Sequence, residues 1–476
     1  MQILKITGVL SLCLILFFPA GSRAQQEKIN WLFGNHSGIT FSGGTPSNIT
    51  GSAMGSLEGT SVVSDASGSL LFYTDGVTVY NKLHSPMPSG TGLQGHASST
   101  QSAIIIKKPG SSTHFYVFTA DAGEYIDPPS EGIHYSEIDM TLDGNKGDII
   151  PGMKNIFLTD SSTEKLCATY HTNGTDNWVM THRWNSDKFY AFLVSSSGVN
   201  TVPVISSSGT AHSGNNDNTI GQMKFSQQAN KLALAVNISG FFELFDFDNA
   251  TGLVSNSIFL QIPQFISAYG VEFSCNGSRL YVSTLYFNSV YQYDLLAGSP
   301  AAIINSRTIV GSTTSGIING AMQLAADNKI YMAMNSGMSG HPYLSKIDFP
   351  DLSGTSCGFL NNAFYLGGSF SFLGLPSFIA SGCIISGMDD FFAATEFSWN
   401  ACYYQNTVFI NTLSDRHQHV DVCIYDLNKR KLFHQQKEIV VGNKTIVEKL
   451  KLVNGVYLVE VRNKYSVAIK KIVAVN

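Results

Sequence analysis

Gly270–Leu295, GVEFSCNGSRLYVSTLYFNSVYQYDL, is the stretch that decides the fold. It begins with a strand of small and apolar residues and turns at Asn276-Gly277-Ser278. An aromatic and β-branched second strand follows, and then a third strand that ends in Tyr293-Asp294. β-branched and aromatic residues favour strands, and Asn, Gly and Ser favour tight turns. The stretch therefore predicts an antiparallel meander of short strands.

The same order of strand, polar turn and strand recurs along the chain. It is found in residues 60–80, 102–139, 166–194, 221–247 and 320–349. The turns are 42 to 64 residues apart and lie near Gly68, Gly110, Gly174, Ala229, Gly277 and Asn328. One such unit cannot bury both faces of its sheet, whereas a ring of units can, and the ring also protects the sheet edges. Repeats of this kind are typical of β-propeller blades.

Six repeat units and two leftover strands set the expected number of blades. The leftovers are Asn30–Phe41 at the start and Phe370–Ala380 at the end, and together they would complete a seventh blade that closes the ring. The sequence therefore predicts an all-β fold with a seven-bladed β-propeller over residues 25–385. Six or eight blades are the alternatives, because the 64-residue interval has room for an insertion.

Beyond the propeller the pattern changes. Residues 386–396 contain Gly387-Met388-Asp389-Asp390 and are predicted to be a linker. Residues 397–476 then carry short strands that are expected to form a small antiparallel β-sandwich. The strands are predicted at Tyr404–Ile410, His419–Tyr425, Ile446–Leu452, Val456–Val461 and Ile469–Val475.

The first residues have the form of a secretory signal peptide. Lys5 precedes the apolar run Val9–Phe18, and the small-residue stretch Ser22-Arg23-Ala24 follows. The run is shorter than the roughly 20 residues that a permanent membrane-spanning helix needs. We expect residues 1–24 to be removed before Gln25, and the mature chain to have no transmembrane helix.

Composition and charge narrow the function classes. The chain of 476 residues has 44 glycines, 11% aromatic and only 13% charged residues, which is typical of an extracellular all-β protein. Its formal net charge is −5, or −7 once Lys5 and Arg23 are removed. Residues 25–394 carry −12 and residues 395–476 carry +5, so the acidic body argues against nucleic-acid binding.

Six cysteines remain after Cys13 is lost with the leader. They form no C-x-x-C pair and no zinc-ligand spacing. Export permits disulfides without requiring them in a domain of this size. Cys402 and Cys423 flank one predicted hairpin and are the best candidate pair, with buried free thiols as the alternative.

Three C-terminal stretches resemble the type A sorting domain of the type IX secretion system: VDVCIYDL at Val420–Leu427, LVNGVYLVEV at Leu452–Val461 and KKIV at Lys470–Val473. The resemblance implies a Bacteroidota-type Gram-negative cell, export through the periplasm and recognition by the type IX secretion machinery. The protein would then be secreted or displayed on the outer cell surface. The sorting residues that the resemblance points to are Gly455, Tyr457, Lys470 and Lys471.

The predicted propeller is similar to the N-terminal regions of gliding and surface proteins from the same bacteria. The stretches that carry this similarity include Trp31–Asn35, Phe72–Gly76 and His96–Ala103. The resemblance implies a propeller-like fold and a surface location, and it implies no particular reaction.

The densest group of polar residues precedes a predicted innermost strand. The candidate ligand-binding residues are Glu58, Asp75, His96, Ser98, Ser99, Thr100 and Gln101. The last four come directly before the apolar strand Ala103–Ile106, so they are expected at the mouth of the central channel. In the alternative interpretation these hydroxyls and amides form hydrogen bonds between blades.

The sequence supports a metal site less well than it supports the ligand site at the channel mouth. His96 would need His171, His182 and His212 as partners, and their spacings match no metal motif. Asp143–Asp148 lacks the bidentate glutamate of an EF-hand and predicts a plain turn. We therefore expect no metal and no cofactor.

The sequence contains no H-E-x-x-H and no P-loop motif. It favours a secreted or surface propeller that binds a protein or glycan partner without catalysis. The alternatives are a propeller hydrolase, lyase or lactonase with a site at the channel mouth, or a structural subunit of a gliding or surface apparatus. Converging carboxylates and histidines at the channel mouth would favour an enzyme, whereas a channel plugged by Ser, Thr and apolar side chains would favour a scaffold.

Overall fold

The computed structural model describes residues 26–123, 131–262 and 267–380 of the N-terminal part of the chain. In the C-terminal part it describes residues 397–404, 407–414, 418–426, 430–439, 442–453, 455–462 and 467–474. The predicted signal peptide and linker lie outside the described residues. The chain divides into two compact units, Met1–Cys383 and Ile384–Asn476. In the described part, none of the helices has both the length and the apolar character needed to cross a membrane.

The described residues of the first unit form seven β-sheets, numbered here in chain order. The first sheet has β1 (Asn30–Phe33), β2 (Ser37–Thr40) and β3 (Ser47–Asn48). The second has β4 (Thr60–Ser64), β5 (Leu70–Thr74), β6 (Thr78–Asn81) and β7 (Pro86–Thr91). The third has β8 (Ala103–Lys107), β9 (His114–Ala120), β10 (Ile133–Asp139), β11 (Asp148–Ile149) and β12 (Ile156–Thr159). The fourth has β13 (Ser162–Tyr170), β14 (Asn177–Arg183), β15 (Ser186–Ser195), β16 (Gly198–Val199) and β17 (Val204–His212).

The remaining three sheets have four strands each. The fifth has β18 (Met223–Phe225), β19 (Lys231–Val236), β20 (Phe241–Asp248) and β21 (Leu253–Gln261). The sixth has β22 (Ala268–Phe273), β23 (Arg279–Thr284), β24 (Ser289–Asp294) and β25 (Thr308–Ser312). The seventh has β26 (Ile318–Leu324), β27 (Ile330–Asn335), β28 (Tyr343–Ile347) and β29 (Phe359–Tyr365). Short helical turns lie in the connections: α2 (Leu142–Asn145), η1 (Asn216–Thr219), α3 (Pro300–Asn305) and η2 (Gly354–Cys357).

Each sheet is buried on both faces, which explains its nearly continuous apolar strands. Successive side chains of a strand point to opposite faces. In β8, Ile104 and Ile106 therefore pack against the fourth sheet, whereas Ala103 and Ile105 pack against the second. Similar apolar cores lie between the remaining pairs of neighbouring sheets along the chain.

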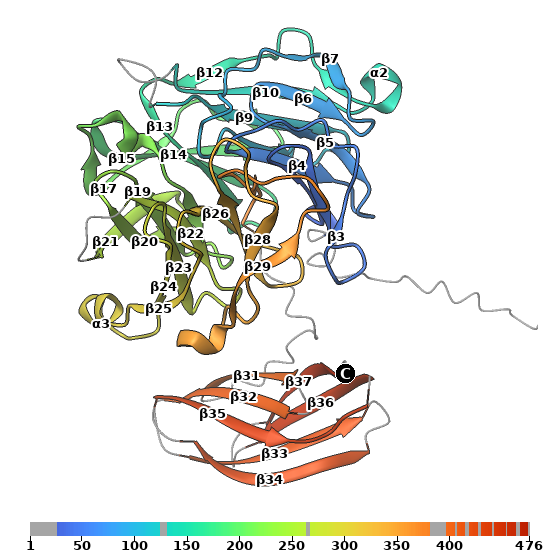
Figure 1. The fold of residues 1–476 in the computed structure, drawn as a ribbon, viewed down its shortest axis with the longest axis vertical. Coiled ribbons are helices and arrows are strands. Elements are labelled where there is room, and N and C mark those ends of the chain that lie inside the picture. The colour runs from blue at the N-terminus through green and yellow to red at the C-terminus, as the bar shows by residue number, and fades with distance from the viewer. Residues whose placement is uncertain are drawn as a thin grey trace, which may run out of the picture. The chain divides into compact units, whose positions relative to one another are not determined.

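The ring closes between the seventh sheet and the first. Trp31 and Phe33 of β1 share a core with Ala321 and Tyr331 of the seventh sheet, and the rings of Trp31 and Tyr331 meet edge to face at 5.8 Å. Leu32 points the other way, into the core with the second sheet. Figure 1 shows the sheets following one another in colour order, with the orange strands back beside the blue ones. The predicted seven-bladed propeller is confirmed.

The first strands of neighbouring sheets contact one another, so they line the axis of the propeller. Because these strands run in the same direction in every blade, their starts mark one end of the axis and their ends mark the other. We call these the entry end and the exit end of the channel.

The segment Phe370–Ala380 meets the first blade at one point, where Asn35 N donates to Phe370 O at 2.9 Å, but it adds no full strand there, which corrects the prediction. Its strand β30 (Pro376–Ser377) pairs in parallel with β4 of the second sheet. Leu373 accepts a hydrogen bond from Ala321 N at 2.7 Å, and Ala380 N donates to Ala168 O at 2.8 Å. The segment thus contacts the first, seventh, second and fourth blades, and it runs along the channel from the entry end to the exit end.

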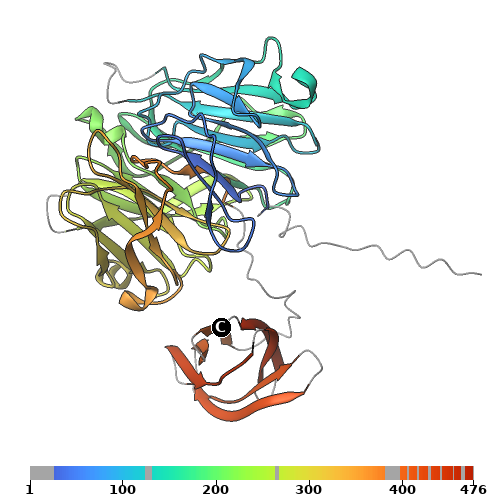
Figure 2. The ribbon, with the colours of Figure 1, turned by 45° about the vertical axis from the view of Figure 1, so that its right-hand side comes forward.

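The second unit is a sandwich of two sheets, as predicted. One sheet has β31 (Phe397–Tyr404), β32 (Thr407–Ser414) and β35 (Gly442–Lys449). The other has β34 (Lys431–Ile439), β33 (Gln418–Asp426), β36 (Gly455–Arg462) and β37 (Val467–Ala474). Figure 2 shows the two sheets facing each other, and Val408, Ile446, Val422 and Val459 are among the residues of the core between them.

The predicted Cys402–Cys423 disulfide is wrong. Cys423 is a buried free thiol, as are Cys167 and Cys357. Cys402 belongs to β31 and Cys423 to β33, which lie in different sheets of the sandwich and form no hairpin. Cys275 is disulfide-bonded.

The segment Phe370–Ala380, here called the channel segment, packs closely against the blades at two glycines. Substitution of these glycines tests its placement. A Cβ on Gly374 would lie 1.6 Å from Glu58 O, and a Cβ on Gly320 would lie 2.3 Å from Leu373 O. We expect Gly374→Ala and Gly320→Ala each to lower the free energy of unfolding by about 1–3 kcal/mol or more in chemical denaturation. Gly55→Ala is the matched control, because its Cβ would meet open space. Equal stability of all three variants would contradict the placement of the segment.

Candidate functional site

The structure buries six of the seven predicted site residues. Ser99 is 0%, Gln101 1% and Thr100 2% exposed, and Ser98, Glu58 and Asp75 are also buried. His96 alone is exposed. The group does lie at the entry end, where the inner strands begin, as the sequence predicted. Its burial means that these side chains form part of the packed interior there.

Gln101 ties three blades together. It precedes β8 of the third blade, and its side-chain Nε2 donates to Met223 O of the fifth blade at 3.0 Å. Its Oε1 accepts from Met223 N at 2.7 Å and from Leu166 N of the fourth blade at 3.4 Å. The side-chain amide therefore pairs with the backbone of an innermost strand as another peptide group would.

Gln222 repeats this arrangement further round the ring. It precedes β18 of the fifth blade, and its Nε2 donates to Met322 O of the seventh blade at 3.3 Å. Its Oε1 accepts from Met322 N at 2.8 Å and from Val271 N of the sixth blade at 3.3 Å. The two glutamines thus link blades three to five and five to seven across the axis.

Thr100 and Glu164 form a second tie. Thr100 donates to Glu164 Oε2 from its backbone N at 2.9 Å and from its hydroxyl at 2.8 Å. The other carboxylate oxygen accepts from Gly123 N at 3.1 Å, and Gly221 N donates to the Thr100 hydroxyl at 3.1 Å. A buried carboxylate needs such donors, so Glu164 organises the loops of three blades.

Asp75 and Glu58 also interact with other residues of the propeller. Asp75 Oδ1 accepts from Val77 N at 2.9 Å and Thr78 N at 2.7 Å, so it caps the turn between β5 and β6. Burial raises the pKa of Asp75. Burial also raises the pKa of Tyr269, with the nearby Glu58 carboxyl as a further cause.

The sequence analysis missed a buried charged cluster between the fourth and fifth blades. Lys165 donates to Thr219 O at 2.9 Å and Ile220 O at 3.1 Å, and burial lowers its pKa. Burial raises the pKa of Glu243 to about 7. One signal was present: Glu164-Lys165 comes directly before the apolar residues of β13, as Thr100-Gln101 comes before β8.

Two of the four histidines considered as metal ligands meet in this cluster. The rings of His182 and His212 stack with centroids 3.7 Å apart, and His212 Nε2 lies 3.6 Å from Glu243 Oε2. Burial, with Lys165 nearby, lowers the pKa of His182 to about 3, so this ring is neutral. Within the described residues, no three His, Cys, Asp or Glu side chains are grouped so as to hold a metal ion. In Asp143–Asp148, Asp143 pairs with Lys146 at 2.8 Å.

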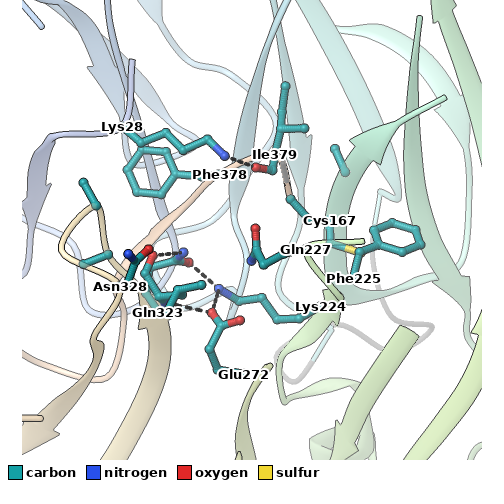
Figure 3. Close-up of a pocket in the computed structure, with 15 residues that line it drawn as sticks. Lys28, Cys167, Lys224, Phe225, Gln227, Glu272, Gln323, Asn328, Phe378 and Ile379 are labelled. Carbon is teal, nitrogen blue, oxygen red and sulfur yellow. Dashed lines mark hydrogen bonds and ion pairs between the residues drawn. The ribbon is translucent and has the colours of Figure 1, made fainter. Parts of the chain in front are cut away.

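At the exit end of the channel, a salt bridge links the innermost strands of the fifth and sixth blades (Figure 3). Lys224 Nζ lies 3.2 Å from Glu272 Oε2 and also donates to Gln323 Oε1. Glu272 Oε2 accepts from Leu324 N at 3.0 Å. Lys28 donates to Ile379 O, and burial lowers the pKa of Lys28 to about 8. The cavity among these residues holds about 40 Å³, room for a few water molecules.

A larger pocket lies beside this cavity. It holds about 360 Å³ and shares Lys28, Phe378 and Ile379 with the smaller one. Its other walls come from β4, from the end of β8 and the turn after it, from the end of β13 and the start of β14, and from Glu27. This pocket has the size of a small-molecule site, so it is the candidate ligand site of the propeller.

The fold and the filled channel define the first unit as a closed seven-bladed β-propeller. No protein-family model and no curated protein matches the chain. Among solved structures, it is similar to a functionally unknown protein from Desulfotomaculum acetoxidans (14% identity, 73% of this chain and 98% of that chain, TM-score 0.44). It is also similar to the periplasmic gluconolactonase PpgL of Pseudomonas aeruginosa (11% identity, 88% of this chain and 98% of that chain, TM-score 0.38). A third similar structure is the β-propeller domain of Myceliophteria thermophila Cps50 (Swd1) (10% identity, 64% of this chain and 93% of that chain, TM-score 0.36). These scores are too low to support any argument about activity.

The burial of the entry-end group gives a second test. We expect Gln101→Ala to lower the free energy of unfolding by about 1–3 kcal/mol, because buried backbone groups lose their partners. Lys82→Ala should change it by less than about 0.5 kcal/mol, because this side chain is exposed. Urea denaturation of both variants measures the difference. Unchanged stability of Gln101→Ala would show that the inter-blade tie is wrong.

Proposed function

We propose that this protein is a secreted or surface-displayed β-propeller that binds a protein or glycan partner without catalysing a reaction. The observation that carries the proposal is the state of the entry end. Thr100 and Gln101 are buried, and their side chains form hydrogen bonds with residues of other blades. A channel closed in this way supports a rigid binding scaffold.

The alternative function is a propeller hydrolase, lyase or lactonase with its site at the channel mouth. It would need polar groups there that are free to contact a substrate. Glu164 instead accepts hydrogen bonds from Thr100 and Gly123, and Gln222 is fully engaged with Val271 and Met322. This geometry favours the binding function over the enzyme.

We also propose that the C-terminal sandwich is a type IX sorting domain. In support, it is a compact unit with its own core, as a removable signal requires. The proposed sorting residues lie on the adjacent strands β36 and β37, where Leu458 and Val459 pair with Lys471 and Lys470. Tyr457 is buried and donates to Val453 O at 2.9 Å. The proposed route is through the periplasm to the medium or the outer cell surface, after removal of residues 1–24.

Deletion of residues 386–476 tests the export proposal. In a Bacteroidota host with a type IX system, we expect the truncated protein to accumulate in the periplasm. Its propeller should keep the melting temperature of the full chain, because Met1–Cys383 forms a compact unit with apolar cores of its own. Fractionation and immunoblotting measure the distribution.

The matched control is a periplasmic reporter fused to residues 386–476, which should leave the cell. Normal extracellular or surface levels of the truncated chain would overturn the sorting role. If the protein co-purifies in fixed ratio with an outer-membrane assembly, a structural-subunit role would replace the binding proposal.

A further inference from the structure

Two histidines are stacked in the interior where the fourth blade meets the fifth. His182 lies on β14 and His212 ends β17, and each residue is 1% exposed. Their ring centroids are 3.7 Å apart, and Phe189 and Phe241 meet the stack edge to face. None of the four ring nitrogens makes a hydrogen bond of normal geometry with a described residue. Buried polar groups without partners are rare, so this stack is kept at a cost in stability.

The surroundings of the stack disfavour a positive charge on either ring. Burial, with Lys165 nearby, lowers the pKa of His182 to about 3 and outweighs the backbone of Arg183, which favours the charged form. Burial also lowers the pKa of His212, with His182 and Lys165 as further causes. Two positive charges on rings this close would repel each other strongly in an interior of low dielectric constant.

Glu243 faces the stack from β20 of the fifth blade. Its Oε2 lies 3.6 Å from His212 Nε2, which is beyond hydrogen-bond length. Its Oε1 accepts from Thr210 N at 3.0 Å and from Ser257 Oγ at 3.3 Å. Burial raises the pKa of Glu243 to about 7, so in weak acid this carboxyl holds a proton while both rings stay neutral.

The other charged groups around the stack do not help to charge it. Lys165 opposes a charge on either ring. Glu164 accepts from Thr100, and Arg183 is paired with Asp160 at 3.0 Å. The charged residues on the surrounding elements, besides Glu243, are Glu164 and Lys165 on β13, Arg183 on β14, Asp187 and Lys188 on β15, Asp217 on η1, and Asp246 and Asp248 on β20.

Acid therefore favours opening of this contact. Once exposed, each imidazole binds a proton below its ordinary pKa of 6.5, whereas both rings are neutral while they are buried. Opening also releases the proton that Glu243 holds above its ordinary pKa of 4.5. The opened state thus gains two protons and loses one, and a net gain of one proton makes opening about tenfold easier per pH unit.

We propose that the stack of His182 and His212 is an acid-sensitive switch, which holds the fourth and fifth blades together at neutral pH and opens their contact below about pH 6. Lys165, beside the stack, donates to Thr219 O and Ile220 O in the connection before β18. This connection belongs to the entry end, so the ties there loosen when the switch opens.

Hydrogen exchange of the mature chain, residues 25–476, followed by mass spectrometry between about pH 6 and pH 5 tests the switch. Division of each rate by the intrinsic exchange rate at the same pH gives the equilibrium constant for opening. We expect this constant to rise about tenfold from pH 6 to pH 5 in peptides from β17 and β20. At pH 5 it should be larger there than in β27 of the seventh blade, which is remote from the stack.

Two variants change the number of protons taken up. His182→Phe removes one of the two protons gained, so the opening constant should become nearly independent of pH over this range. Glu243→Gln removes the proton lost, so the rise should steepen to about fiftyfold. His36→Asn is the matched control, because His36 is exposed in the turn between β1 and β2, and its rise should equal that of the wild type.

A rise in His182→Phe as large as in the wild type, or no steepening in Glu243→Gln, would overturn the switch. Opening constants in β17 and β20 no larger than in β27 at pH 5 would do the same, because the ring would then open as a whole. If His182→Phe does not fold, the comparison of Glu243→Gln with the wild type still decides.

Discussion

Burial of apolar side chains on both faces of every sheet is the constraint on which this structure depends. Ile104 and Ile105 of one strand already belong to different cores, so no blade is stable without a neighbour on each side. The chain meets this requirement by returning Trp31 and Phe33 against the seventh blade. The ring then brings seven innermost strands together at an axis, where their polar ends have to be satisfied.

Side chains and backbone of the protein itself bind many of the polar groups at the axis. Gln101 and Gln222 pair with backbone two blades away, Glu164 gathers N–H groups, and the segment Phe370–Ala380 adds its own hydrogen bonds along the channel. These ties leave the entry end packed and move the open, ligand-sized space to the exit end. The same closure thus makes the scaffold rigid and determines where a ligand can be held.

The sequence predicts much of the fold because strand and turn signals are local. The stretch Gly270–Leu295 forms β22, β23 and β24 as expected, and the repeat period gives the number of blades. The partners of Gln101 could not be predicted, because Met223 is 122 residues away and meets it only through ring closure. The pocket residues likewise come from separate segments, and the polar group before β8 gave no local sign of whether it would be buried.

Hydrogen exchange of the channel segment, followed by mass spectrometry, tests the central claim that this segment and the ties at the axis close the propeller. Leu373 N donates to Leu57 O at 2.9 Å and Ala380 N donates to Ala168 O, both within the ring. The account predicts that peptides covering residues 371–380 are protected as strongly as those from β22, and that they exchange only when the whole ring opens. Exchange of residues 371–380 as fast as that of exposed turns, while β22 stays protected, would contradict it.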